Sequence, residues 1–168
     1  MRQIVLDTET TGLEVSQGHR IIEIGCVELV SRRPTGRHFH RYLNPEREID
    51  EGAVAVHGLT LAKLSREPRF ADIAEEFVAF VEGAELVIHN AAFDVAFLDA
   101  ELRRLGGERA PLGNLCRVLD TLSLACFYLD NPVKVAFLVN LRFFNNAFHN
   151  FIVVVVSHFH FNNTIIIN

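Results

Sequence analysis

The order of the apolar patterns constrains this fold more than any other feature of the sequence. Strand-like runs come first, at residues 4–6 and 20–30, which are rich in Ile and Val, and at 37–43, where polar and apolar residues alternate imperfectly; turn residues at 10–13 and 32–36 join them. Helical spacing of apolar residues covers 71–82 and 91–105, and further strand-like runs lie at 84–89 and 116–120. This order predicts an α/β fold with a mixed five-stranded sheet flanked by helices.

Length and charge are those of an ordinary globular chain. Its 168 residues, 49% hydrophobic and 22% charged, suit a single domain. The net charge of −5 argues mildly against a basic face that binds nucleic acid. An active site made of carboxylates escapes that argument, because bound metal ions would supply the positive charge beside phosphate.

The cysteines and the apolar runs indicate the compartment. The three cysteines include no C-x-x-C pair, which argues against a disulfide framework and a structural zinc site. Asp7 closes the N-terminal apolar run too early for a signal peptide. No run in residues 1–125 is long enough to span a bilayer, and the run at 151–156 is also too short. We therefore expect a cytoplasmic protein with no membrane partner.

Residues 126–168 differ in character from the rest of the chain. Their only charged residues are Asp130, Lys134 and Arg142, Glu is absent, and Phe, Val, Ile and Asn dominate. Strand propensity is high in this segment and no helical period appears. We expect one domain, residues 1–168, in which 1–125 follow a single design and 126–168 are atypical.

Asp7 and Glu9 follow the first strand-like run, in the phrase Asp-Thr-Glu-Thr-Thr-Gly. Residues two apart in a strand point to the same face, so the two carboxylates lie side by side and repel each other unless a cation separates them. Oxygen ligands of this kind suit hard divalent cations. A bare D-x-E is more often a solvated strand end, but the small Thr-Thr-Gly turn leaves room for a nucleotide and favours a metal site.

Asp94 closes a second phrase, His-Asn-Ala-Ala-Phe-Asp, at the point where a strand meets a helix. The helix dipole favours an acid in the first turn, so a role limited to starting the helix explains Asp94 equally well. The end of the preceding strand is also where α/β proteins collect site residues. Alone, this phrase leaves both interpretations open.

Together, these phrases resemble the DEDD exonuclease superfamily, which has a ribonuclease-H-like fold and whose first three acids match Asp7, Glu9 and Asp94. The amino-acid sequence at residues 2–12, 21–25, 56–58 and 85–94 is similar to that of the epsilon, or proofreading, subunit of bacterial DNA polymerase III. The resemblance covers about residues 1–125. It implies a 3′→5′ DNA exonuclease that uses two divalent metals, Mg²⁺ or Mn²⁺. The implied partners are a single-stranded DNA 3′ end and the polymerase catalytic subunit of the replicative holoenzyme.

The resemblance also assigns roles to single residues. It implies that Asp7 bridges both metals, that Glu9 helps to hold the nucleophile-side metal, and that Asp94 serves the second metal. The residues implied to bind the terminal nucleotide are Asp7, Glu9, Thr10, Thr11, Gly12, Leu13 and His57. Asp120 also follows a strand, but we interpret it as structural.

The last two site residues of the superfamily, a histidine base and an aspartate five residues later, are missing here. No aspartate follows Asp130, so His149, His158 and His160 have no partner at that spacing. Loss of a general base typically slows a reaction by about 10²–10⁴-fold. A shifted reading frame, an altered or artificial segment, and a natural relative that lost the chemistry each explain residues 126–168.

Two alternatives stand beside a proofreading DNA exonuclease. A DEDD exonuclease acting on RNA ends would carry the same carboxylates, although the close wording of the phrases favours the polymerase-associated form. A non-catalytic, polymerase-associated module that binds 3′ ends would explain the missing histidine and aspartate. The intact Asp7, Glu9 and Asp94 count against that module.

Overall fold

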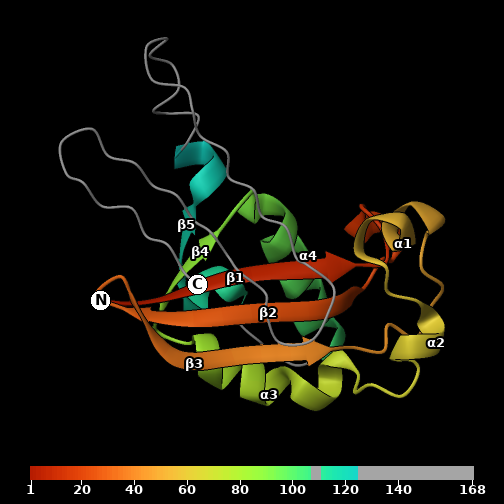
Figure 1. Ribbon diagram of the computed structural model, residues 1–168, viewed down its shortest axis with the longest axis horizontal. Helices are drawn as coiled ribbons and strands as arrows, with labels where there is room; N and C mark the ends of the chain where they lie inside the picture. The colour runs from red at the N-terminus through yellow and green to blue at the C-terminus, as the bar shows by residue number, and fades with distance from the viewer. Residues whose placement is uncertain (107–110, 125–168) are drawn as a thin grey trace, which may run out of the picture. The chain divides into compact units, whose positions relative to one another are not determined.

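A computed structural model describes residues 1–106 and 111–124 of the chain (Figure 1). Residues Met1–Leu122 form one compact unit. Its five strands are β1 (Arg2–Thr10), β2 (Ile21–Val30), β3 (Arg33–Tyr42), β4 (Glu85–Ile88) and β5 (Arg117–Asp120). They form one sheet in the order β3-β2-β1-β4-β5. The first three strands pair antiparallel, and β4 pairs parallel with both β1 and β5. The predicted mixed five-stranded sheet is therefore confirmed.

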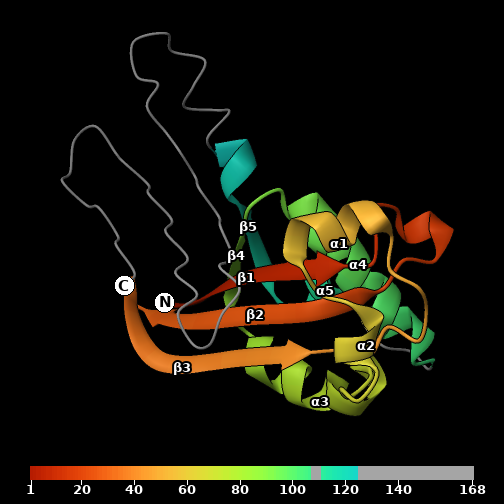
Figure 2. The same ribbon diagram turned by 45° about the vertical axis from the view of Figure 1, so that its right-hand side comes forward.

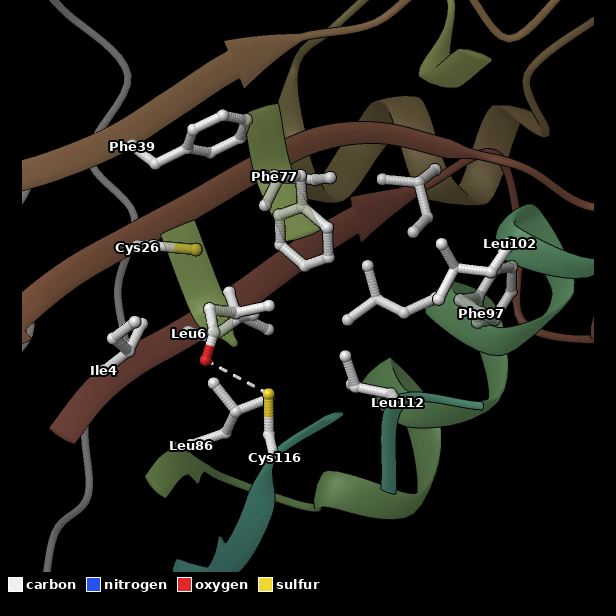
Figure 3. Packing of buried hydrophobic residues seen from close by; sticks show 14 of the residues in the cluster. Ile4, Leu6, Cys26, Phe39, Phe77, Leu86, Phe97, Leu102, Leu112 and Cys116 are labelled. Carbon is white, nitrogen blue, oxygen red and sulfur yellow. Dashed lines mark hydrogen bonds between the residues drawn. The ribbon is translucent and has the colours of Figure 1, made fainter. Parts of the chain in front are cut away.

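Two long helices supply the apolar cover of the sheet. They are α3 (Phe70–Val81) and α4 (Ala91–Arg104), which agree with the helices predicted at 71–82 and 91–105. Their buried side chains Phe77 and Phe97 share one core cluster with Ile4 and Leu6 of β1 (Figure 3). Alternation along β1 explains this packing, because Ile4 and Leu6 point to the same face of the strand.

Four short helical segments lie outside the predicted elements. They are η1 (Val15–Gln17), α1 (Glu51–His57), α2 (Leu61–Leu64) and α5 (Leu112–Leu115). Each is too short for a repeat of apolar residues at helical spacing to show in the sequence. Figures 1 and 2 show α1 and α2 at the end of the sheet where β1 stops. The C-cap of α1 is Gly58, whose φ of 72° suits glycine.

The first strand is longer than the apolar run that predicted it. Residues 4–6 account for its buried apolar part, but pairing with β2 continues through Glu9 opposite Glu23 and, after a register shift, to Thr10 opposite Ile21. Pairing with β4 ends earlier, at Val5 opposite Val87. The far end of β1 therefore keeps one neighbouring strand and leaves its other edge open to a different group.

The turn between β2 and β3 corrects the sequence interpretation, which predicted a turn over residues 32–36. The chain reverses at Ser31 and Arg32, and Arg33 already pairs with Val30. Both turn residues have positive φ, 52° and 64°, as a tight two-residue hairpin requires. The prediction was wrong because Pro34 suggested a turn, whereas it lies in β3, an edge strand where proline is tolerated.

Two further expectations, the lack of a membrane span and the atypical segment at 126–168, concern residues that lie partly or wholly outside the described ranges. Within the described residues, no helix has the length and apolar character needed to cross a bilayer. The expected change of design near residue 125, and the histidines His149, His158 and His160, lie outside the described residues. The division into 1–125 and 126–168 stays a prediction.

Two neighbouring arginines test the position of the hairpin turn. Arg32 occupies a left-handed conformation that costs an ordinary residue roughly 1 kcal/mol, so Arg32→Gly should stabilise the protein by about 0.5–1 kcal/mol. Arg33 lies within β3, so Arg33→Gly should destabilise it by about 0.5–1 kcal/mol. Urea unfolding of both variants measures these changes. Equal effects would place the turn elsewhere.

Candidate active site

Asp94 completes the open edge of β1. Beyond the last β1–β4 pair, the backbone N–H of Thr8 donates to Asp94 Oδ1 at 2.9 Å, and the Thr8 hydroxyl donates to the same oxygen at 2.7 Å. Asp94 is in the first turn of α4 and is only 3% exposed. The helix begins after Asn90, whose left-handed φ of 59° redirects the chain from β4. A helical carboxylate thus takes the place of a neighbouring strand.

The same end of β1 carries Asp7 and Glu9. Asp7 lies opposite Gly25 of β2, where there is no side chain, and Glu9 lies opposite Glu23. The structure brings near one another the three acids that the sequence singled out, Asp7, Glu9 and Asp94, since the charge of Asp94 acts on both Asp7 and Glu9 and that of Glu9 acts on Asp7.

Burial raises the pKa values of all three acids, and repulsion from neighbouring acids adds to the shifts of Asp7 and Glu9. The pKa of Asp7 is raised to about 8, first by burial and then by the charges of Asp94, Glu9 and Glu23. The pKa of Glu9 is raised to about 7 by burial, Glu23 and Asp94. Burial raises the pKa of Asp94 to about 6, although the hydrogen bonds from Thr8 oppose that shift. Carboxylates held together at such a cost suit a site where a cation supplies the missing positive charge.

The chemistry of these donors fits a hard divalent cation, because every candidate ligand atom is a carboxylate oxygen. Within residues 1–106 and 111–124, no three His, Cys, Asp or Glu side chains come close enough together to hold one ion. The described residues thus offer suitable ligands at one edge of the sheet without a closed metal cage.

Glu23 is a fourth acid at this site that the sequence interpretation did not single out. Its carboxylate accepts a hydrogen bond from His40 Nε2 at 2.7 Å, and it bonds to the side chain of Tyr42. The side chain is largely buried, and its charge raises the pKa of both Asp7 and Glu9. An acid inside the apolar run Ile-Ile-Glu-Ile was the available signal, since a buried acid requires a partner.

The proposed nucleotide-binding residues lie just beyond β1. The Thr10 hydroxyl donates to the carbonyl of Gly12 at 2.7 Å, which closes a tight turn, and Leu13 is 78% exposed. His57 ends α1, where its Nδ1 accepts from the backbone N–H of Leu59 at 3.0 Å. Burial lowers the pKa of His57, and a hydrogen bond with the backbone of Thr10 opposes this shift. The structure thus joins His57 to the turn at residues 10–13.

Asp120 has the structural role expected of it. Its Oδ1 accepts from the backbone N–H of Asn90 at 3.1 Å and from that of Leu122 at 3.0 Å. These bonds join the end of β5 to the residue where α4 begins. Asp120 is not among the charges that raise the pKa values of Asp7 and Glu9.

The sequence is similar to proteins of one family. The profile of the exonuclease (RNase_T) family matches residues 4–150. DNA polymerase III subunit epsilon of Escherichia coli K12 is 50% identical over 128 residues, which are 74% of this chain and 53% of that relative. The subunit of the same name from Rickettsia felis is 46% identical over 125 residues, or 74% of this chain and 55% of that relative. The chain spans about half the length of the curated relatives it matches.

Solved exonucleases share the fold. Exonuclease X, solved in complex with 5′-overhanging duplex DNA, has a TM-score of 0.55 and 25% identity over 80% of this chain and 68% of that one. Apo exonuclease I has a TM-score of 0.69 and 19% identity over 83% of this chain and 33% of that one. At that identity exonuclease I bears on the fold alone, and it confirms the expected ribonuclease-H-like α/β arrangement.

The raised pKa of Asp7 predicts how stability depends on pH. A carboxyl group whose pKa is raised from 3.8 to about 8 on folding contributes stability at low pH that is lost as pH rises through the folded value. In EDTA, Asp7→Asn should therefore gain stability over the wild type between pH 5 and pH 8. We expect a relative gain of at least about 1.4 kcal/mol, equivalent to one pKa unit, in urea unfolding. The same difference at both pH values would contradict the raised pKa.

Proposed function

The chain belongs to the exonuclease family, and from this membership we propose that it is the 3′→5′ exonuclease domain of a proofreading subunit of a replicative DNA polymerase. The observation that supports this proposal best is the group of buried and partly buried acids at the open edge of β1. Asp94 is held there by two hydrogen bonds from Thr8, beside Asp7 and Glu9. The family depends on divalent metals, and this site has the carboxylates that such metals require.

We propose that Asp7, Glu9 and Asp94 hold two Mg²⁺ or Mn²⁺ ions. Bound metals of this kind activate water and stabilise the attacking and leaving oxygens of a phosphodiester. In this proposal the protein contributes by holding the three carboxylates in position. Thr8 fixes Asp94, and the side-chain-free Gly25 opposite Asp7 leaves space on the neighbouring strand. Two metal ions would also lower the pKa values of the acids, since positive charge favours the carboxylate form.

The substrate that we propose is the 3′ end of single-stranded DNA. The turn at residues 10–13 and the end of α1 lie next to the acids, and His57 joins the two segments through the backbone of Thr10. Leu13 and Val56, 78% and 83% exposed, offer apolar surface on these segments that suits stacking with a base. The terminal nucleotide would then lie with its sugar and base against this surface and its phosphate toward the carboxylates.

The partner that we propose is the polymerase catalytic subunit of the replicative holoenzyme. Support comes from two epsilon subunits whose sequences are 50% and 46% identical to this chain. The chain spans about half the length of each. The compartment that we propose is the cytoplasm, because the buried thiols of Cys26 and Cys116 are free, as a reducing environment favours.

A non-catalytic module that binds 3′ ends is the second candidate. One observation favours it, namely that the sequence has no aspartate after Asp130 to pair with a late histidine. Such a module would keep the nucleotide surface and would bind DNA without cutting it.

Degradation of a 5′-labelled single-stranded DNA oligonucleotide in Mn²⁺ tests the activity. We expect products that shorten from the 3′ end, with a rate reduced at least about 10²-fold in Asp7→Ala because a carboxylate proposed to hold the metals is lost. Glu76→Gln, which changes a half-exposed acid of α3, should retain the wild-type rate. A folded wild type that binds the oligonucleotide without shortening it would favour the binding module.

Thermal unfolding with added Mn²⁺ tests the metal site separately from cleavage. Ions that bind only the folded state raise the midpoint, by the equivalent of about 2.7 kcal/mol when their concentration is 100 times the dissociation constant. We expect such a rise in the wild type and a smaller one in Asp94→Asn, which removes a ligand charge but keeps the shape. No rise in the wild type would contradict the metal site.

A further inference from the structure

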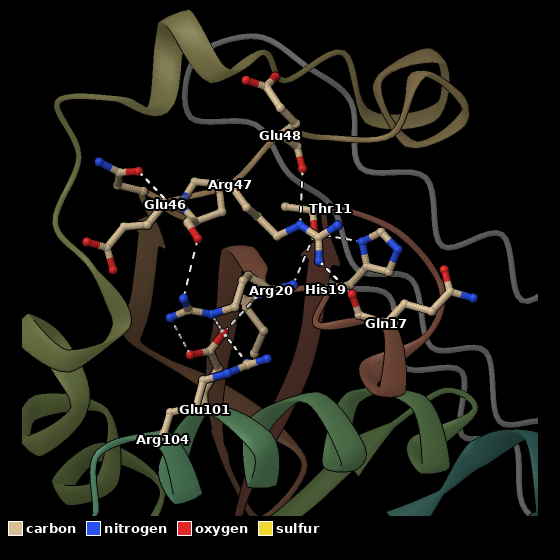
Figure 4. Close-up of polar contacts among 12 residues, drawn as sticks. Thr11, Gln17, His19, Arg20, Glu46, Arg47, Glu48, Glu101 and Arg104 are labelled. Carbon is tan, nitrogen blue, oxygen red and sulfur yellow. Dashed lines mark hydrogen bonds and ion pairs between the residues drawn. The ribbon is translucent and has the colours of Figure 1, made fainter.

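His19 is a buried histidine that the proposed chemistry does not use. It precedes β2 and is 3% exposed. Its ring lies directly against the backbone of Gly12, since a Cβ atom built on Gly12 would come within 2.3 Å of His19 Cε1. Figure 4 shows the ring next to Thr11 at the end of the β1 turn. This close contact explains why a glycine occupies position 12 in the turn at residues 10–13.

The hydrogen bonds around Thr11 fix the orientation of this ring. The Thr11 hydroxyl accepts from the backbone N–H of Arg20 at 3.0 Å and forms a second hydrogen bond with His19 Nδ1, also at 3.0 Å. When Nδ1 accepts the Thr11 proton, the hydrogen of the ring is on Nε2. This nitrogen faces Asp50 Oδ2 at 3.5 Å.

Asp50 connects the ring to α1. It is the N-cap residue of α1, and its backbone N–H donates to the carbonyl of Thr11 at 3.0 Å. His57 lies at the other end of the same helix and contacts the backbone of Thr10. The turn at residues 10–13 therefore contacts α1 at both ends of the helix. At its start, Asp50 bonds to the backbone of Thr11, and His19 lies between the two side chains. At its end, His57 bonds to the backbone of Thr10.

We propose that His19 is a positioning residue for the pocket of the terminal nucleotide. This inference rests on the proposed function. The ring supports Gly12 from behind, accepts from Thr11 and donates toward Asp50, so it holds the turn at residues 10–13 and helix α1 in one arrangement. Both surfaces of the pocket, the turn and the end of α1, then face the same nucleotide before it binds, which lowers the cost of ordering them.

Binding of thymidine 5′-monophosphate in Mn²⁺, measured by calorimetry, tests this role without requiring cleavage. We expect His19→Ala to weaken binding about tenfold, as the loss of one or two hydrogen bonds predicts. His19→Gln, whose amide can accept and donate along the same line, should recover most of the affinity. His38→Ala, which changes an exposed histidine of β3, should bind as the wild type does. Equal affinity of folded His19→Ala and wild type would overturn the proposal.

A pair of substitutions tests the contact between His19 and Gly12. Gly12→Ala alone should weaken nucleotide binding because the new methyl group meets a ring that is buried and cannot move away. In the His19→Ala background the space is free, so the same substitution should add little further loss. Additive losses would contradict the contact. Asp50→Ala, at a side chain that is 58% exposed, supplies a variant expected to remain folded and to bind less tightly.

Hydrogen exchange of the free protein separates failure of the inference from failure of the proposed function. His19→Ala should speed amide exchange in residues 10–13 and 51–57 but not in α3. Unchanged exchange there would overturn the positioning role even if no nucleotide binds. If exchange changes as expected but the folded wild type does not bind the nucleotide in Mn²⁺, the proposed function fails, and the nucleotide-binding part of this inference fails with it.

Discussion

The two hydrogen bonds from Thr8 to Asp94 are the interaction on which the site depends. A buried carboxylate is costly unless it is bonded, and Thr8 supplies both a backbone and a side-chain donor to one of its oxygens. These donors are available because β4 stops pairing with β1 at Val5. The start of α4 is thereby fixed on the central strand, and a third acid reaches the pair formed by Asp7 and Glu9.

The charges around this cluster differ from those around the other buried acids of the described fold. Elsewhere in the described fold, buried acids pair with arginine. Glu28 accepts from Arg2 at 2.7 Å, and Glu101 binds the guanidinium of Arg20 through both oxygens at 2.6 and 2.8 Å (Figure 4). At the open edge of β1 the dominant charges acting on Asp7 are other acids, which raise its pKa. This contrast is why we propose a metal-binding role for the acids near β1 and a stabilising role for Glu28 and Glu101.

Particular elements show where prediction from sequence succeeds. Helices α3 and α4 span three or more turns, so their apolar repeats indicate type and position, and Asp7, Glu9 and Asp94 occur in phrases distinctive enough to indicate a shared site. The short helical segments η1, α1, α2 and α5 have seven residues or fewer, so no periodic pattern marks them. Glu23 and His19 escape prediction for another reason, since their partners His40, Thr11 and Asp50 lie on other segments.

Apolar periodicity and short motifs are local properties of the chain, so they were enough to predict the mixed sheet, its two long helices and the three acids of the candidate site. The contact of Thr8 with Asp94, the approach of Glu23 to the acids and the support of Gly12 by His19 became visible in the folded protein alone. These facts depend on which residues face each other across strands and between distant segments. Strand register and the end of the β1–β4 pairing set those neighbours, and no local pattern encodes them.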